Sequence, residues 1–220
     1  MVNRASGNMY LLLSLLFLSF LFYFCGVNTA GGFETTNGLR ITVCADSLWG
    51  KATPGSQIIF CATSFIAPDL SANSFLDTVY ADLNGNFSLY SLPSGRYNLV
   101  ARSEDFKRGA VISNINIDKL NLLERSESSE YLSLGSISGS VISTIDQSSL
   151  IFIEGMAIFD STNAGIFRLS NIPSGKYKIQ AYQKINRDLE TDIYYGSQEN
   201  VVLMESGNET GVDLIMELID

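Results

Sequence analysis

Apolar and polar positions alternate in two short runs near the middle of the chain. Phe87 and Leu89 are separated by polar Ser88, and after a short break Tyr97 and Leu99 are spaced in the same way. Period-two alternation is typical of strands that bury one face. This stretch therefore predicts a strand, a tight connection and a second strand.

The same stretch recurs 80 residues later with no gap. A repeat of this length suits two small tandem domains better than the short units of a solenoid. Between the two strands, a proline presets φ for a turn, and the glycine two residues on is expected to take the positive φ that closes it. The shared positions that define the motif are Gly85, Phe87, Pro93, Gly95 and Tyr97 in the first copy and Gly165, Phe167, Pro173, Gly175 and Tyr177 in the second.

The motif Gly-x-Phe-x-Leu-x-x-(Leu/Ile)-Pro-x-Gly-x-Tyr-x-(Leu/Ile)-x-Ala resembles the signature of carboxypeptidase regulatory-like domains, which have a transthyretin-like β-sandwich. Asp82-Leu83-Asn84-Gly85 resembles the Asp-x-x-Gly turn before the Phe strand in that family. The resemblance covers most of residues 38–220. It implies an all-β chain of two tandem Greek-key sandwiches, transthyretin-like or immunoglobulin-like. It also implies a non-catalytic module, since such domains occur beside many different partners.

Composition divides the chain into five segments, which are 1–25, 26–37, 38–122, 123–133 and 134–220. We expect these to be, in order, a signal peptide or membrane anchor, a flexible tether, a first β-sandwich, an acidic serine-rich linker and a second β-sandwich. Each sandwich falls in the size range of an independent small domain. Few contacts are expected across the linker, so each sandwich should unfold separately.

The N-terminus carries a targeting signal, because Arg4 precedes an uncharged run from Met9 to Val27. One interpretation is a cleaved secretory signal peptide. A second is a retained anchor, since about 19 apolar residues can just span a bilayer. A third is lipidation of Cys25, because Cys25-Gly26 resembles a bacterial lipoprotein cleavage site. All three predict export, and we expect the chain to be held on the cell envelope, at the bacterial outer membrane or in the periplasm.

Charge and composition exclude several functions. The chain has 14 Lys and Arg against 23 Asp and Glu, so its net charge of −9 repels nucleic acid and anionic lipid head groups. There is no histidine, which removes Ser-His-Asp and Cys-His catalysis and histidine-ligated zinc. The carboxylates show no recognisable catalytic pair. We therefore predict no enzyme activity, no cofactor and no metal site.

Cys44 and Cys61 flank a turn centred between Ala52 and Thr53. A symmetric hairpin would place the two cysteines directly opposite each other, with Cβ atoms about 4.5–5.5 Å apart. Export would supply the oxidant for a disulfide between them. The alternative is two small thiols, buried or half-exposed.

The leading hypothesis is a non-catalytic, envelope-anchored protein that acts as a structural, display or spacer module. The alternative is a surface receptor that binds a carbohydrate or a protein through sandwich loops at 64–74 and 183–199. A rigid contact between the sandwiches would favour the spacer. An exposed aromatic cluster beside a groove would favour the receptor.

Overall fold

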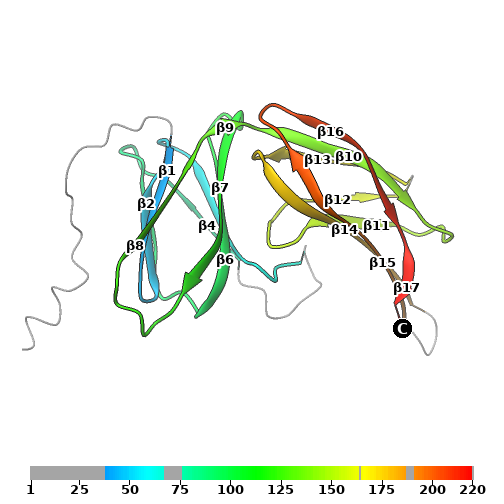
Figure 1. The fold of residues 1–220 in the computed structure, drawn as a ribbon, viewed down its shortest axis with the longest axis horizontal. Coiled ribbons are helices and arrows are strands. Elements are labelled where there is room, and N and C mark those ends of the chain that lie inside the picture. The colour runs from blue at the N-terminus through cyan, green and yellow to red at the C-terminus, as the bar shows by residue number, and fades with distance from the viewer. Residues whose placement is uncertain (1–37, 67–75, 164, 187–190, 220) are drawn as a thin grey trace, which may run out of the picture. The chain divides into compact units, whose positions relative to one another are not determined.

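The computed structural model describes residues 38–66, 76–163, 165–186 and 191–219. These residues form strands joined by turns, with no helix among them, so the all-β prediction is confirmed (Figure 1). The described part of the chain accordingly offers no helix long and apolar enough to cross a bilayer. The predicted targeting segment, including Cys25, and the tether 26–37 lie outside the described residues.

The strands follow one another in two sets. The first set is β1 (Gly38–Cys44), β2 (Ser47–Lys51), β3 (Gln57–Ala62), β4 (Leu76–Tyr80), β5 (Asn86–Leu89), β6 (Gly95–Arg102), β7 (Arg108–Ile117), β8 (Arg125–Glu130) and β9 (Leu132–Ser133). The second set is β10 (Gly135–Ile142), β11 (Ser149–Ile153), β12 (Phe159–Thr162), β13 (Ile166–Ile172), β14 (Gly175–Asn186), β15 (Thr191–Leu203), β16 (Asn208–Ile215) and β17 (Glu217–Ile219).

The first sandwich packs a four-stranded sheet, β5-β2-β1-β8, against a five-stranded sheet, β4-β3-β6-β7-β9. Leu39 and Ile41 of β1 and Phe60 of β3 are fully buried members of the core between them. The intervening positions of β1 are more exposed. The predicted period-two pattern is therefore what brings the two sheets face to face.

The second sandwich packs a three-stranded sheet, β13-β10-β16, against a five-stranded sheet, β12-β11-β14-β15-β17. Its core includes Ile137, Phe167 and Ile179, each at most 1% exposed. β10 and β16 run parallel, whereas β10 pairs antiparallel with β13. The chain thus closes this sheet with a strand from near its C-terminal end.

The repeat identifies which strands correspond in the two halves. Phe87 lies opposite Gly50 of β2, and Phe167 lies opposite Gly139 of β10. A side chain at Gly50 would collide with the Phe87 ring. β2 is therefore the counterpart of β10, and β1 is an additional strand that occupies the place beside β2 that β16 takes beside β10.

The predicted linker 123–133 is wrong in part, because residues Arg125–Glu130 form strand β8. This strand pairs antiparallel with β1, in a register that sets Ser128 opposite Arg40. The run lacks apolar alternation because β8 is an edge strand whose side chains are mostly exposed. The backbone can pair with β1 without any apolar pattern, so the composition suggested a linker where the first sandwich gains a strand.

The expectation of few contacts between the sandwiches is also wrong. Ile59, Cys61 and Val100 point away from the first core and belong to the apolar cluster of the second sandwich. Their neighbours Ile58 and Phe60 belong to the first core. β3 is consequently buried on both faces, which explains its continuous apolar run.

Candidate functional site

The proline-glycine connection has the same hydrogen bond in both copies. The Tyr97 hydroxyl donates to the Pro93 carbonyl oxygen at 2.8 Å, and the Tyr177 hydroxyl donates to the Pro173 carbonyl oxygen at 2.6 Å. Burial raises the pKa of both tyrosines. Each buried phenol therefore has its acceptor within the motif, and this arrangement holds the end of the core closed.

The backbone of this connection differs from the prediction. Positive φ is taken by Ser91 at 57° and Asn171 at 59°, just before the Leu-Pro or Ile-Pro step. Gly175 is required for another reason, because a Cβ there would meet the Tyr177 hydroxyl at 2.9 Å. A Cβ at Gly95 would make only an ordinary contact with the Tyr97 ring, at 3.4 Å.

The glycines that begin the motif do take positive φ, at 78° in Gly85 and 74° in Gly165. In the first copy the Asp82 carboxylate accepts the backbone N–H groups of Asn84 and Asn86, both at 2.8 Å. The pKa of Asp82 is lowered, and the largest cause is the hydrogen bond from the backbone N–H of Asn86. Asp82 therefore shapes a turn between two strands.

The predicted disulfide between Cys44 and Cys61 is not formed. Cys44 lies in β1 opposite Ser47, while Cys61 lies in β3, in the other sheet, opposite Asn98. The symmetric hairpin is absent because the chain turns directly after Cys44 and inserts β2. The Cys44 Sγ donates to the Leu122 carbonyl oxygen at 3.5 Å. Burial raises the pKa of Cys61 to about 12, so its thiol is not a nucleophile at neutral pH.

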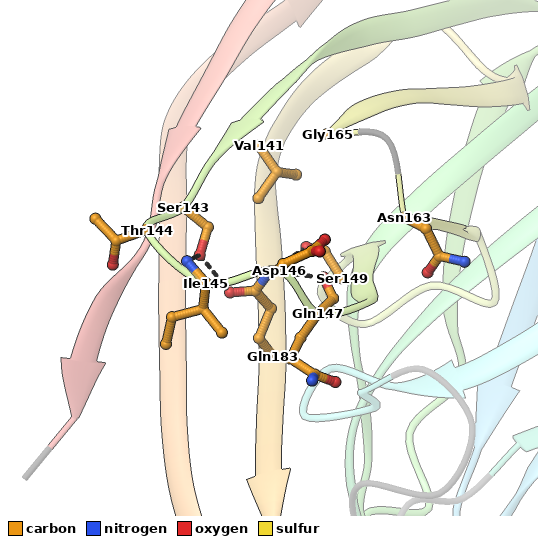
Figure 2. Close-up of a pocket in the computed structure, with 10 residues that line it drawn as sticks. All are labelled: Val141, Ser143, Thr144, Ile145, Asp146, Gln147, Ser149, Asn163, Gly165 and Gln183. Carbon is orange, nitrogen blue, oxygen red and sulfur yellow. Dashed lines mark hydrogen bonds between the residues drawn. The ribbon is translucent and has the colours of Figure 1, made fainter.

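A polar pocket of about 310 Å³ lies at one end of the second sandwich (Figure 2). Its lining comes from the end of β10, the β10–β11 connection, the start of β11, the turn before β13 and strand β14. The lining residues are Val141, Ser143, Thr144, Ile145, Asp146, Gln147, Ser149, Asn163, Gly165 and Gln183.

Gln183 organises the pocket, although its side chain is only 2% exposed. Its Oε1 accepts the Ser143 hydroxyl at 2.7 Å, and its Nε2 donates to the Gln147 carbonyl oxygen at 3.0 Å and to Ser149 Oγ at 2.9 Å. These hydrogen bonds fix the β10–β11 connection onto β14 (Figure 2). Sequence reasoning missed Gln183, because a glutamine at an inward strand position gives no signal until its partners are known.

The pocket is lined mainly by polar groups and has one ionisable side chain. Asp146 is the one ionisable side chain among the described residues that line it. Nowhere in the described ranges do three or more His, Cys, Asp or Glu side chains gather as metal ligands. Hydroxyls, amides and a single carboxylate can hydrogen-bond a small polar molecule, but they supply no nucleophile with an activating base.

The predicted binding loops are placed differently. Residues 67–74 of the first loop lie outside the described residues, as do residues 187–190 of the second. The rest of 183–199 belongs to strands β14 and β15, which pair closely and place Tyr182 opposite Tyr195. Lys178 of β14 forms ion pairs with Glu154 at 3.7 Å and Glu199 at 3.3 Å. This part of the second sandwich is therefore a sheet surface.

Comparisons with known proteins give no family. No family model matches the chain, and no curated protein matches it. Among solved structures, the Bacillus anthracis TIE protein is similar at 14% sequence identity and a TM-score of 0.23. The match covers 85% of this chain and 42% of that chain, so the present chain spans less than half the length of that protein.

Proposed function

We propose that this chain is a non-catalytic protein of the cell envelope that acts as a spacer or display module. The observation that carries the proposal is the apolar contact between the two sandwiches. A spacer must hold its two ends at a fixed separation, and domains linked by a small polar contact move relative to one another. Here a shared apolar cluster takes the place of a flexible joint.

The contact combines apolar packing with directional hydrogen bonds. Asn98 is 9% exposed, and its Nδ2 donates to the Gly155 carbonyl oxygen at 3.1 Å. Its Oδ1 accepts the N–H of Asn114 at 3.0 Å. The N–H of Gly155 donates in turn to the Phe65 carbonyl oxygen at 2.9 Å. Buried polar groups that satisfy one another across an apolar surface fix one orientation, because any slip would leave them unpaired.

Glycine allows the close approach at this contact. A Cβ at Gly155 would meet Asn98 Nδ2 at 2.5 Å and the Thr63 carbonyl oxygen at 2.9 Å. A Cβ at Gly109 of β7 would collide with Leu134 at 2.6 Å and would make an ordinary contact with Pro173 at 3.5 Å. The turn of the second motif therefore lies beside β7, while the β11–β12 connection approaches the first sandwich closely at Gly155.

The two sandwiches are assigned in this proposal to the carboxypeptidase regulatory-like type, with a transthyretin-like fold. The support is the repeated motif with its Tyr-to-Pro hydrogen bond at the same place in each copy. Such modules are non-catalytic, which agrees with a chain that has no histidine. No nucleic acid partner is proposed for a chain of net charge −9.

The anchor is assigned to the N-terminus. Export is inferred from Arg4 and the uncharged run from Met9 to Val27. We assign lipidation to Cys25 at the end of that run, which would hold the mature chain on the envelope membrane, with a retained apolar segment as the other outcome of the test.

The proposal is tested by fractionating cells that produce the full chain. We expect the protein in the envelope membrane fraction, resistant to extraction with high salt and released by detergent. A Cys25→Ser variant should remain in the membrane as an unprocessed precursor of higher mass. Recovery of the native chain in a soluble fraction would contradict the anchored module.

The second candidate is a receptor for a small carbohydrate or protein ligand, favoured by the polar pocket around Gln183. Asp146 and Asn163 are lining residues that no hydrogen bond described above commits to the fold. Asp146→Ala should abolish binding of a sugar ligand in calorimetry, with Asp118→Ala, far from the pocket, as the matched control. Identical titrations for the two variants would remove the pocket from consideration.

A further inference from the structure

Three leucines project from the connection between β7 and β8 at one end of the first sandwich. Leu120 is 92% exposed, Leu122 is 69% exposed and Leu123 is 76% exposed. We call residues 118–124 the leucine loop. Single exposed leucines are common on soluble proteins, but three within four positions of one loop form a concentrated apolar tip that marks an interaction site.

The backbone of the leucine loop is hydrogen-bonded. The Asp118 carboxylate accepts the N–H of Leu120 at 3.0 Å, and the Asn121 side chain accepts the N–H of Leu123 at 3.1 Å. The N–H of Asn121 donates to the Asp118 carbonyl oxygen, and its own carbonyl oxygen accepts the N–H of Ala45, both at 2.9 Å. The loop therefore has an ordered backbone that holds the leucines outward.

We propose that the leucine loop inserts into the lipid bilayer to which the N-terminus anchors the chain. An apolar environment penalises unpaired backbone groups, and in this loop the N–H groups of Leu120, Asn121 and Leu123 already have acceptors. The leucine side chains gain free energy when a bilayer removes them from water. The inference rests on the proposed anchoring, which brings a bilayer to the chain, and it adds that the first sandwich lies against the membrane.

Chain length permits this contact. β1 leads from Gly38 to the end of the sandwich that holds the leucine loop, a path of about 23 Å for its seven residues. The tether 26–37 can extend about 40 Å. The tether is therefore long enough to run from Gly38 back past β1 to a bilayer that contacts the leucine loop.

The negative charge of the protein determines which lipid head groups it can approach. The leucine loop contains Lys119 together with the acidic Asp118 and Glu124, and the whole chain carries a net charge of −9. Anionic head groups would repel this surface. We therefore expect the leucine loop to insert into bilayers of zwitterionic lipid, and added anionic lipid should weaken the insertion.

The test uses the full chain in phosphatidylcholine vesicles that carry a nitroxide quencher on the acyl chains. Leu122→Trp places a fluorophore in the leucine loop. Leu83→Trp is the matched control, because Leu83 is 94% exposed but lies in the turn that meets the other end of β2, where the N–H of Ala52 donates to the Gly85 carbonyl oxygen. The native Trp49 contributes equally to both variants.

We expect acyl-chain quenching several-fold stronger for Leu122→Trp than for Leu83→Trp. Adding Leu120→Ser and Leu123→Ser to Leu122→Trp should bring its quenching down to the control level. Equal quenching at the two sites would overturn insertion of the leucine loop. Flotation of the vesicles separates this result from failure of the anchor: a chain that floats without quenching refutes insertion alone, and a chain that does not float refutes both the insertion and the anchoring.

Discussion

Phe167→Ala should weaken both sandwiches, although the substitution lies in the second. Phe167 is 1% exposed and belongs to the cluster that also contains Ile59, Phe65 and Val100 of the first sandwich. Emptying a buried aromatic site costs about 3–5 kcal/mol. Whether the first sandwich is also destabilised depends on the free energy of the contact between the two sandwiches.

The strength of the contact follows from the side chains that it buries. Ile59, Phe65 and Val100 are each at most 7% exposed. At about 1.5–3 kcal/mol for each side chain, their burial contributes roughly 5–9 kcal/mol, an upper value. This upper value is equal to or larger than the cost of Phe167→Ala. The damaged sandwich should therefore not unfold while the first stays intact.

The assay is urea unfolding of the full chain in mild detergent with two probes. Trp49 is the only tryptophan and lies in β2, so its fluorescence reports the first sandwich. Far-UV circular dichroism reports the strands of both. We expect the two curves to coincide, and Phe167→Ala to shift both midpoints downward together.

Phe87→Ala is the matched change in the first sandwich, where Phe87 is 6% exposed. It should produce a shift of the same kind in both signals. If Phe167→Ala left the Trp49 transition in place while the dichroism curve split into two steps, the sandwiches would be independent and the reasoning would be refuted.

Three further changes test other parts of the structure. Tyr177→Phe removes the hydrogen bond to Pro173 and should cost about 1 kcal/mol at neutral pH. Because burial raises the pKa of Tyr177, the protonated phenol stabilises the fold fully below its unfolded pKa of about 10, and this stabilisation is lost as pH rises toward the folded pKa. In urea titrations, the difference in stability between the native chain and Tyr177→Phe should therefore become smaller at alkaline pH. Gly139→Ala places a Cβ against a carbonyl oxygen of β16 and should cost about 1–3 kcal/mol, while Ser138→Ala on the same strand should be nearly neutral. Cys25→Ser should abolish a lipid adduct in the intact mass of the membrane-extracted chain, and a native chain that begins at Gly31 without added mass would contradict lipidation.

The repeated motif could be read from the sequence because its information is local. Alternation around Phe87 and Phe167 predicts strands wherever they end up in the sheets, and the conserved spacing from Pro to Tyr fixes the connection. The exact turn could not be derived, because positive φ is taken by Ser91 and Asn171, whose residue types do not require it.

Features that depend on distant partners were not predictable in the same way. β8 has no apolar pattern of its own, and its pairing with β1 decides its structure. The expected Cys44–Cys61 pair failed because one inserted strand moved the two residues to different sheets. Gln183 is buried because its amide meets Ser143, Ser149 and a backbone carbonyl, none of which is near it in the sequence.

The burial of β3 on both faces had a visible signal. Ile58 through Cys61 form a continuous apolar run, which is typical of a strand covered on both sides. Chain length alone favours two independent domains, and it does not predict what covers the second face of that run. The contact between the sandwiches is therefore indicated by the apolar run of β3 and not by the length of the chain.

The distance between the two sandwiches tests the central claim most directly. Spin labels would be placed on Leu83→Cys and Ile166→Cys, which replace side chains that are 94% and 72% exposed. The background would carry Cys25→Ser, and the buried Cys44 and Cys61 should not react. Pulsed dipolar spectroscopy should give one narrow distance distribution that is the same in detergent and in vesicles. A broad distribution, or two populations, would contradict a rigid two-sandwich spacer.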